Sequence, residues 1–392
     1  MPSHAFTFFR PRTLEEISQT YSWFADMRSH QPVFYNEELQ LWQVFRYEDV
    51  ITVLTDYNRF SSRPIMRFNG GFLRETLVSK DPPEHRKLRN LVNQAFTPRA
   101  VAHLSDRITQ ITQELLDQVR AKGKMDVVSD IAFPLPAKVI AEMLGVPAED
   151  WDIFQRWARV DGSDPTVMRR EPTRFQRMQQ EMSSYFSGLL EDRRCSPRED
   201  LITALCNAEV DGERLSEREL VSFCMLLLFA GQETTKNLIA NAILCFTDHP
   251  DTMDRLIREP ALMPSAIEEV LRYLSPVWFL FRSTRTDVEL GGQHIPANQP
   301  VLAWIASANH DPDQFRDPDR LDIEREPNRH VAFGHGVHFC VGAPLSRLEA
   351  KIALPMMLDQ LKGLQRVRDF PITVNTGIVF VIRSLPVTFQ PA

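Results

Sequence analysis

The chain has 392 residues, of which 43% are hydrophobic and 25% charged, and it carries a formal net charge of −7. The composition is typical of a globular protein, and the negative charge disfavours a nucleic-acid partner. No stretch of about 18 apolar residues is present, and the N-terminus lacks the apolar core of a signal peptide. We therefore expect a soluble, cytoplasmic protein without a membrane anchor.

Cysteine usage and linkers bear on compartment and domain number. An odd number of cysteines without framework spacing argues against a disulfide scaffold and for a reducing compartment. No Ser/Gly-rich linker, internal repeat or low-complexity tract divides the chain. We predict a single domain over residues 1–392, with β-rich regions near both ends and a large helical region between. The cysteines are Cys195, Cys206, Cys224, Cys245 and Cys340.

Short strands are predicted at both ends of the chain, with helices between them. Residues 33–35 and 39–45 flank Asn36-Glu-Glu and favour a hairpin. Apolar residues at helical spacing follow Thr97-Pro98, and helical patterns continue through most of residues 138–275. The expected fold class is mainly α with small β-sheets (α+β). Further strand-like runs lie at 288–290, 293–295, 378–382 and 387–389.

A helix start is predicted at Asp81-Pro-Pro-Glu84. Asp81 can cap the helix, Pro82 suits its first position, and Glu84 can complete a capping box. His85 and Arg89 then lie on one helical face. Two such groups can hold a pair of carboxylates, because the arginine fork matches carboxylate geometry. The alternative is a basic, solvated helix face.

A largely buried helix is predicted over residues 226–244. Its middle contains Gly231, Glu233, Thr234 and Thr235. Burying a carboxylate and hydroxyls is costly unless they are paired or serve water. A threonine inside a helix can also bond an upstream carbonyl and bend the helix locally. The pattern indicates either an internally satisfied polar kink or a functional site.

Two further groups of charged residues precede the late strands. Glu269 and Arg272 are three residues apart, so they share a helical face and can pair. Such pairs are common and usually form solvated surface bridges. Arg282 and Arg285 precede a hairpin at 288–295, and each can be an ordinary solvated residue.

The stretch 332–342 places Cys340 among closely spaced glycines, which favours a tight turn. Residues 345–354 are predicted to form a helix, and a thiolate at a helix N-terminus is stabilised as an anion. A stabilised thiolate beside a flat Phe fits an axial haem ligand. One alternative is a small buried cysteine. Another is zinc bound with His335 and His338, although a structural zinc site needs four ligands.

This loop resembles that of the cytochrome P450 family, Phe-Gly-x-Gly-x-His-x-Cys-x-Gly, at every fixed position. The polar centre of helix 226–244 resembles the family's Ala/Gly-Gly-x-Asp/Glu-Thr motif, and Glu269-Val-Leu-Arg272 resembles its Glu-x-x-Arg pair. The motifs occur in the family's order. The resemblance implies the cytochrome P450 fold, with haem b between a long central helix and the helix after the cysteine loop.

The resemblance also implies roles for single residues. Cys340 would ligate the iron, Thr234 would hydrogen-bond bound dioxygen, and Glu233 would take part in proton delivery. Glu269 and Arg272 would form a buried structural network with Arg320. Haem propionates would be held by His85, Arg89, Arg282 and His338. The other implied cofactor-binding residues are Ala230, Gly231, Phe333 and Gly342.

A haem-thiolate monooxygenase is the implied activity, inserting one atom of dioxygen into a hydrophobic organic substrate by hydroxylation or epoxidation. Electrons would come from a ferredoxin or flavodoxin with its reductase. The docking residues for this partner are hypothesised to include Arg86, Lys87, Arg99, Arg347 and Lys351. Alternatives are a hydrogen-peroxide-driven peroxygenase and a haem-based sensor or ligand-binding protein. The intact Glu233-Thr234 pair argues against both.

The substrate pocket is expected to be apolar. A fatty acid, terpenoid, steroid or macrolide-like compound fits such a pocket, and the sequence does not choose among them. For each aromatic residue the alternative is that it fills the core. The candidate pocket residues are Met66, Phe68, Phe72, Leu226, Val277, Trp278, Phe279 and Phe380.

Overall fold

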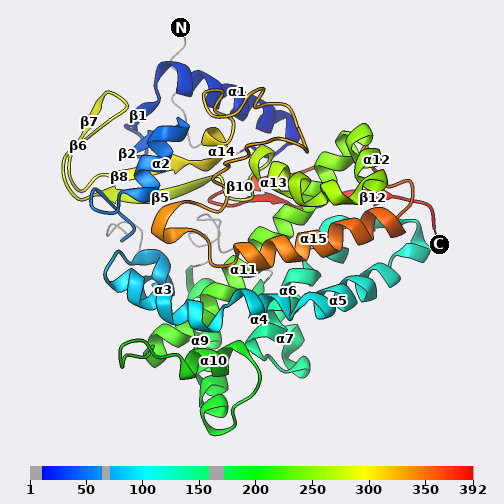
Figure 1. Ribbon diagram of the computed structural model, residues 1–392, viewed down its shortest axis with the longest axis horizontal. Coiled ribbons are helices and arrows are strands. Elements are labelled where there is room, and N and C mark those ends of the chain that lie inside the picture. Colours follow the sequence, from blue (N-terminus) through cyan, green and yellow to red (C-terminus); the bar gives the residue numbers. More distant parts are fainter. Residues whose placement is uncertain (1–10, 64–70, 159–171, 392) are drawn as a thin grey trace. The chain divides into compact units, whose positions relative to one another are not determined.

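The computed structural model describes residues 11–63, 71–158 and 172–391 (Figure 1). The chain divides into two compact units, and each is described here by itself. The first unit comprises Met1–Asn69, Ala261–Cys340 and Arg368–Leu385. The second comprises Gly70–Pro260, Val341–Val367 and Pro386–Ala392.

The first unit is built around a five-stranded sheet with the strand order β1-β2-β8-β5-β3. The predicted hairpin is confirmed, because β1 and β2 pair antiparallel with Val33 opposite Val44. The strands of the first unit are β1 (Val33–Asn36), β2 (Leu41–Val44), β3 (Phe60–Ser61), β5 (Phe279–Thr284), β6 (Val288–Leu290), β7 (Gln293–Ile295), β8 (Pro300–Trp304), β10 (Val374–Thr376) and β11 (Phe380–Ile382). Its helices are α1 (Leu14–His30), α2 (Tyr47–Thr55), α13 (Met263–Tyr273), α14 (Ile305–Ala308) and the 3-10 turn η7 (Gly336–His338).

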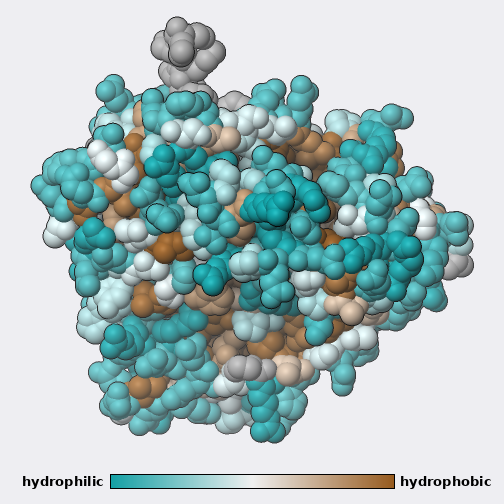
Figure 2. Space-filling model, turned by 45° about the horizontal axis from the view of Figure 1, so that its top comes forward, coloured by the Kyte–Doolittle hydropathy of each residue, from teal (hydrophilic) through white to brown (hydrophobic). Residues whose placement is uncertain are grey.

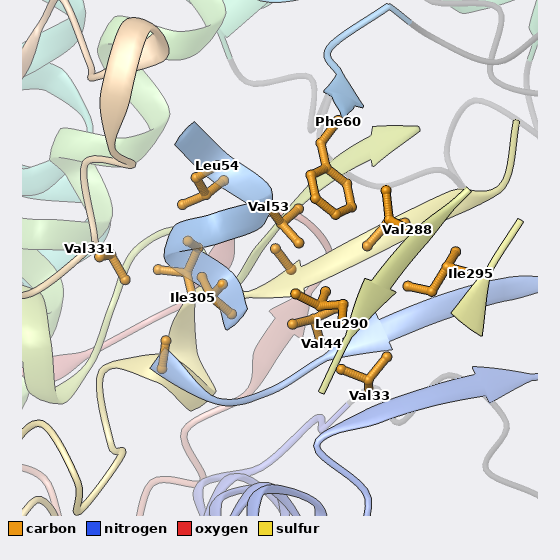
Figure 3. Packing of buried hydrophobic residues seen from close by; sticks show 14 residues of the cluster. Val33, Val44, Val53, Leu54, Phe60, Val288, Leu290, Ile295, Ile305 and Val331 are labelled. Atoms are coloured by element: carbon orange, nitrogen blue, oxygen red, sulfur yellow. The ribbon is translucent and has the colours of Figure 1, made fainter. Parts of the chain in front are cut away.

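A cluster of aliphatic side chains holds α2 against this sheet. Val53 and Leu54 of α2 point toward Val44 and Ile305, and Phe60 lies beside them (Figure 3). All of these side chains are almost completely buried. Burial of this apolar surface supplies the main free energy that keeps helix and sheet together.

The second unit is mainly helical. A small sheet with the order β4-β12-β9 joins segments far apart in sequence. Its helices are α3 (Glu84–Ala95), α4 (Pro98–Ala102), α5 (Ser105–Asp117), α6 (Pro134–Leu144), α7 (Trp151–Ala158), α9 (Pro172–Cys195), α10 (Leu201–Asn207), α11 (Glu217–Asp248), α12 (Pro250–Arg258) and α15 (Ala343–Gln360). Shorter elements are η1 (Gly71–Glu75), η2 (Leu77–Ser79), η3 (Arg120–Lys122), η4 (Val128–Ala132), η5 (Ala148–Asp150), η6 (Pro260–Leu262, at the unit boundary), β4 (Lys124–Asp126), β9 (Gln365–Arg366) and β12 (Pro386–Thr388).

The longest of these helices, α11, begins with a complete capping box. Ser216 Oγ accepts a hydrogen bond from the Glu219 N–H at 3.3 Å, and the Glu219 carboxylate accepts one from the Ser216 N–H at 2.8 Å. These bonds satisfy backbone donors that the helix itself leaves unpaired. Most residues of α11 are buried, and it packs against α6, α9 and α15. Helix α15 also runs along α5, where Gln113 and Gln360 exchange side-chain hydrogen bonds (Figure 1).

The fold class is confirmed as mainly α with small sheets, and two predicted helix boundaries were wrong. Helix α3 begins at Glu84, and Pro83 occupies its N-cap, so Asp81 and Pro82 lie before the helix. The helical pattern after Thr97-Pro98 is broken into α4 and α5 near His103. Apolar periodicity continues across this break, because both helices bury the same side of the chain. The single-domain assignment stays a prediction.

The face of the molecule in Figure 2 is mostly hydrophilic, with hydrophobic residues scattered across it. Large exposed hydrophobic side chains include Phe339, which is 39% exposed. Over the described ranges, no helix combines the length and apolarity needed to cross a membrane.

Candidate active site

The cysteine loop depends on glycines at two turns. Gly334 and Gly336 have φ angles of 70° and 69°, a region that favours glycine. A Cβ on Gly336 would also lie 3.3 Å from the Thr55 Cα. The loop is closed by a hydrogen bond of 3.0 Å from the Cys340 N–H to the Phe333 carbonyl. It presents Cys340 as an exposed side chain outside any disulfide, shortly before α15 begins.

Two aromatic residues belong to the cysteine loop: Phe339 directly precedes Cys340, and the Phe333 carbonyl accepts the bond from the Cys340 N–H. The rings of Phe333 and Phe339 are 6.3 Å apart, and Phe333 also lies near His330. Phe339 was not predicted as a site residue, because the matched motif allows any residue there. Its exposure beside Cys340 is the only signal that marks it.

The two donors expected to hold carboxylates in the first unit are both half-buried. His338 Nε2 lies 3.0 Å from Ser62 Oγ. Arg282 stands within β5 and donates to the Phe281 carbonyl at 2.7 Å. Arg285 follows the end of β5 and is exposed. The structure therefore distinguishes the two arginines by their surroundings and favours Arg282 as the one available to a buried ligand.

Glu269 and Arg272 form a completely buried ion pair, with both side chains 0% exposed. Arg272 donates to both carboxylate oxygens at 2.8 Å. It also donates to the carbonyls of Asn309 and Pro318 at 2.8 and 2.7 Å. The pair is thus a satisfied buried network and not the solvated surface bridge that was the alternative.

The second cation of this network was predicted wrongly. The Arg320 side chain is 69% exposed, and only its backbone carbonyl accepts a bond from Arg272. Arg325 takes the place instead, with its Nε 3.2 and 3.1 Å from the two Glu269 oxygens. Asn328 Nδ2 donates to the same carboxylate at 3.1 Å. No spacing in the sequence marks Arg325, because an irregular loop brings it back to α13.

The middle of α11 has a partly exposed stripe on an otherwise buried helix. Ala230 is exposed, and Leu226 and Thr234, four residues to either side, are half-buried. Thr234 Oγ1 donates to the Ala230 carbonyl at 2.8 Å, as expected for a helical threonine. Packing explains why position 231 is a glycine, since a Cβ there would lie 2.7 Å from Ile140 Cδ1 of α6. Its place in a cofactor site stays a prediction.

Polar groups are buried around this stripe. Lys236 Nζ donates to Glu233 Oε1 at 2.9 Å, and Thr235 Oγ1 donates to Ser346 Oγ of α15 at 3.1 Å. Both polar side-chain atoms of Asn237 are buried without a hydrogen-bond partner in the described part of the chain. Groups of this kind normally meet water or a ligand.

Glu349 of α15 is the most unusual of these groups. It is 0% exposed, and neither carboxyl oxygen has a hydrogen-bond partner within the residues described. Burial raises its pKa well above the ordinary value of 4.5. Burial therefore favours the protonated, neutral form of this side chain.

Helix α3 separates its basic residues by face. His85 is buried and Arg89 half-buried, on the side that also buries Leu88. Arg86 and Lys87 are exposed, and Lys87 pairs with Glu213. The prediction that His85 and Arg89 share one face of the helix is thus confirmed. Their role in holding carboxylates stays a prediction.

Several predicted pocket residues pack in the core. Trp278 stacks on Phe380 with ring centroids 5.4 Å apart, and Phe279 packs against Trp304 at 5.1 Å. These three predicted residues are at most 3% exposed, so their assignment to a pocket wall was wrong. Apolarity alone could not separate a core position from a pocket wall. Val277 is half-buried and bridges to Val379.

Other predicted pocket residues border open space in the second unit. Phe72 stacks on Phe229 with centroids 5.8 Å apart. Phe72 also lines a cavity of about 590 Å³, together with Val221 and Met225 of α11. Its polar lining was not predicted from sequence and includes Gln176, Gln180, Ser183 and Arg218. Met66 and Phe68 lie outside the described residues.

The zinc alternative gains no support. Among the described residues, no three His, Cys, Asp or Glu side chains gather closely enough to hold a metal ion. This includes His335, His338 and Cys340.

Comparisons with known proteins identify the class. The family model described as Cytochrome P450 matches residues 13–145 and 151–390. The chain belongs to the cytochrome P450 family. It is 41% identical over 374 residues to Cytochrome P450 109 of Bacillus spizizenii, covering 92% of this chain and 89% of the relative. It is 40% identical over 382 residues to the cyclomarin C epoxidase CymV of Salinispora arenicola, covering 94% and 96%.

Solved structures agree with this assignment. A crystal structure of CYP109E1 from Bacillus megaterium in complex with testosterone has a TM-score of 0.87 and 40% sequence identity. The match covers 94% of this chain and 99% of that chain. The protein is accordingly a monooxygenase with haem b as its cofactor, and as a bacterial-type member it binds a small substrate and uses a redox partner. The comparisons favour neither the peroxygenase nor the sensor alternative.

The residues present fit a haem with thiolate ligation. Cys340 is exposed and outside any disulfide, in a glycine loop that keeps it accessible. In the second unit, α11 exposes Ala230 and half-exposes Thr234, although most of this helix is buried. A flat apolar group would cover such a stripe.

Proposed function

We propose that Cys340 supplies the thiolate that ligates the haem iron. The observation that carries this proposal is the exposure of Cys340, outside any disulfide, in a loop whose turns favour glycine. Thiolate ligation gives the haem the electron donation that favours O–O bond cleavage. Phe333 and Gly342, which flank the thiol, would border the cofactor.

A carbon monoxide difference spectrum tests this proposal. The reduced protein with carbon monoxide should show the red-shifted Soret band of thiolate ligation. Cys340→Ser should lose that band while its far-UV circular dichroism stays that of the folded protein. A retained red-shifted band in Cys340→Ser would reject Cys340 as the ligand. Cys195→Ser is the matched control, because Cys195 is also exposed and outside any disulfide.

His85, Arg89, Arg282 and His338 are proposed to hold the haem propionates. Their support is that all four are buried or half-buried donors, whereas neighbouring Arg86 and Arg285 are exposed. Arg282→Ala should speed haem loss to an acceptor such as apomyoglobin. Arg285→Ala is the control and should leave the rate unchanged. Equal rates in the two variants would reject Arg282.

Thr234 and Glu233 are proposed to pass protons at the oxygen-binding side. Thr234 Oγ1 can donate a proton once it rotates away from the Ala230 carbonyl, and the Glu233 side chain, after taking up a proton from solvent, can replace it. Ala230, one turn before Thr234, is exposed on the helix surface. Thr234→Ala should uncouple electron use from product formation, whereas Thr235→Ala should have a smaller effect. Normal coupling in Thr234→Ala would reject the role of Thr234.

The proposed substrate is a hydrophobic compound of steroid or terpenoid size. This is supported by the testosterone complex of CYP109E1 and by the apolar side chains Phe72, Leu226 and Val277. The cavity of about 590 Å³ lies within the range of small-molecule sites. A screen for substrate-induced shifts of the Soret band tests this proposal. Binding of charged, polar compounds alone would reject it.

The proposed electron donor is a small acidic ferredoxin or flavodoxin with its reductase. Arg86, Arg99 and Lys351 are exposed cations near the segments assigned to the haem. Arg347 is half-buried and Lys87 is paired with Glu213, so both are weaker candidates. Reversing the charge of Arg86 and Lys351 should slow reduction and weaken its dependence on salt. An unchanged rate would reject this docking surface.

We also propose a cytoplasmic location. None of the five cysteines, all of which lie in the described residues, forms a disulfide, which is typical of a reducing compartment. Cell fractionation with an antibody against the chain tests the location.

A further inference from the structure

The motif of α11 continues with a lysine that the proposed function does not use. Lys236 is only 8% exposed, although it lies in the middle of a helix that buries most of its residues. Lysine is almost never buried unless its charge is paired. Its partner is the Glu233 carboxylate, with Nζ 2.9 Å from Oε1. The side chains of this pair are 11% and 10% exposed.

The geometry of the pair has a consequence for the neighbouring threonine. Glu233 and Lys236 are three residues apart, so the ammonium draws the carboxylate along the helix toward the C-terminal end. Thr234 Oγ1 is meanwhile engaged with the Ala230 carbonyl one turn back, at 2.8 Å. Both groups with proposed roles in proton delivery are thus held by partners on their own helix.

We propose that Lys236 is a positioning residue that holds the Glu233 carboxylate and thereby sets the rate of proton delivery past Thr234. This inference rests on the proposed role of Glu233. Each proton that leaves Glu233 is replaced from solvent, which the small exposed fraction of the pair admits. Lys236 keeps its own proton throughout, so its part is to orient the carboxylate.

Removing the ammonium is expected to disturb both coupling and stability. In Lys236→Met the carboxylate is left buried without its cation. The product formed per electron pair should fall by about tenfold, less than the factor that a positioned proton-transfer group itself contributes. The solvent deuterium isotope effect on turnover should increase. Lys236→Arg should restore both values, because it retains a donor cation at the same position.

Thermal unfolding gives a second readout that does not depend on turnover. Lys236→Met should lower the unfolding midpoint, and Glu233→Gln in the same background should recover part of that loss. The recovery is expected because the double variant has no unpaired buried charge. The matched control is Lys362→Met, which removes the lysine of an exposed Asp359–Lys362 pair with the same spacing and an N–O distance of 3.0 Å. Its coupling, isotope effect and midpoint should stay unchanged.

The outcomes separate this inference from the proposed function. If Glu233→Gln uncouples turnover but Lys236→Met behaves as wild type, Lys236 has no positioning role and Glu233 keeps its own. If Glu233→Gln leaves coupling unchanged, the proposed role of Glu233 is wrong and the inference is wrong with it. If Lys236→Met does not fold, Lys236→Gln is compared with Lys236→Arg. Equal coupling and isotope effects in those two variants would overturn the inference.

Discussion

Two helices of this protein carry a glutamate and a cation three residues apart, and the two pairs have different surroundings. Glu269 and Arg272 are both 0% exposed. Glu233 and Lys236 keep 10% and 11% of their side chains exposed. Arg272 saturates its guanidinium with two carboxylate bonds and several backbone carbonyls. The lysine has one compact charge and a flexible stem.

The difference indicates different roles for the two pairs. The Glu269–Arg272 network is a fixed support, whereas the proposed role of the Glu233–Lys236 pair requires exchange of protons with solvent. Breaking the Glu269–Arg272 pair would leave many bonds unmade at once, which suits a structural support. The Glu233–Lys236 pair is coupled to solvent and can be broken at a lower cost. Glu349 extends the comparison to a third buried glutamate, which lacks a hydrogen-bond partner within the described ranges and whose pKa is raised by burial.

The largest effect is expected from Arg272→Ala. It should lower the free energy of unfolding by about 3–5 kcal/mol, because the Glu269 carboxylate would stay buried without its main partner. Urea denaturation followed by circular dichroism measures the change. Lys236→Met should lower the free energy of unfolding by a smaller amount in the same assay. A larger loss in Lys236→Met than in Arg272→Ala would reverse the comparison.

A smaller effect is expected from removing Arg325, the second cation of the Glu269 network. Arg325→Ala should lower the free energy of unfolding by about 1–3 kcal/mol, since it removes bonds to a charged, buried acceptor. Arg320→Ala should change it by less than about 0.5 kcal/mol, because that side chain is 69% exposed. A larger loss of stability in Arg320→Ala than in Arg325→Ala would contradict this assignment and support Arg320 as the network's cation.

Packing next to the Glu233–Lys236 pair can be tested at Gly231. Gly231→Ala places a methyl group against Ile140, and overpacking of this kind costs about 1–3 kcal/mol. Alanine returns about 1 kcal/mol through its helix propensity. Ile140→Val removes the atom that is approached most closely. It should therefore destabilise Gly231→Ala less than it destabilises the wild type, and additive losses would contradict this explanation.

A further effect, which depends on pH, is expected at Glu349. Its pKa is raised in the folded state, so the folded protein keeps a proton that the unfolded chain releases above about pH 4.5. The free energy of unfolding should fall as the pH rises from 4.5 to the folded pKa, by at most about 1.4 kcal/mol per pH unit. Glu349→Gln should remove this component. Urea denaturation at several pH values would contradict the prediction if both proteins gave the same slope.

Prediction from the sequence succeeded for residues close together in the chain and failed for contacts between distant segments. The spacing of His85 and Arg89 predicted their common face on α3, because four residues make about one helical turn. The glycines around Cys340 predicted a turn, which the φ angles show. The choice of Arg320 failed, since the loop after α14 has no periodicity from which the facing residue can be inferred. Trp278, Phe279 and Phe380 failed because a core and a pocket have the same apolar composition.

By itself the sequence determined the cytochrome P450 class, the cysteine in its glycine loop and the glutamate–cation spacings. Each of these depends on residues within a few positions of one another, where backbone geometry is set by local sterics and hydrogen bonds. Only the tertiary structure decided that Arg325 completes the Glu269 network, that three predicted pocket residues are core, and that Lys236 is buried against Glu233. Burial and long-range partners arise when distant segments pack together, and no local pattern in the chain encodes that packing.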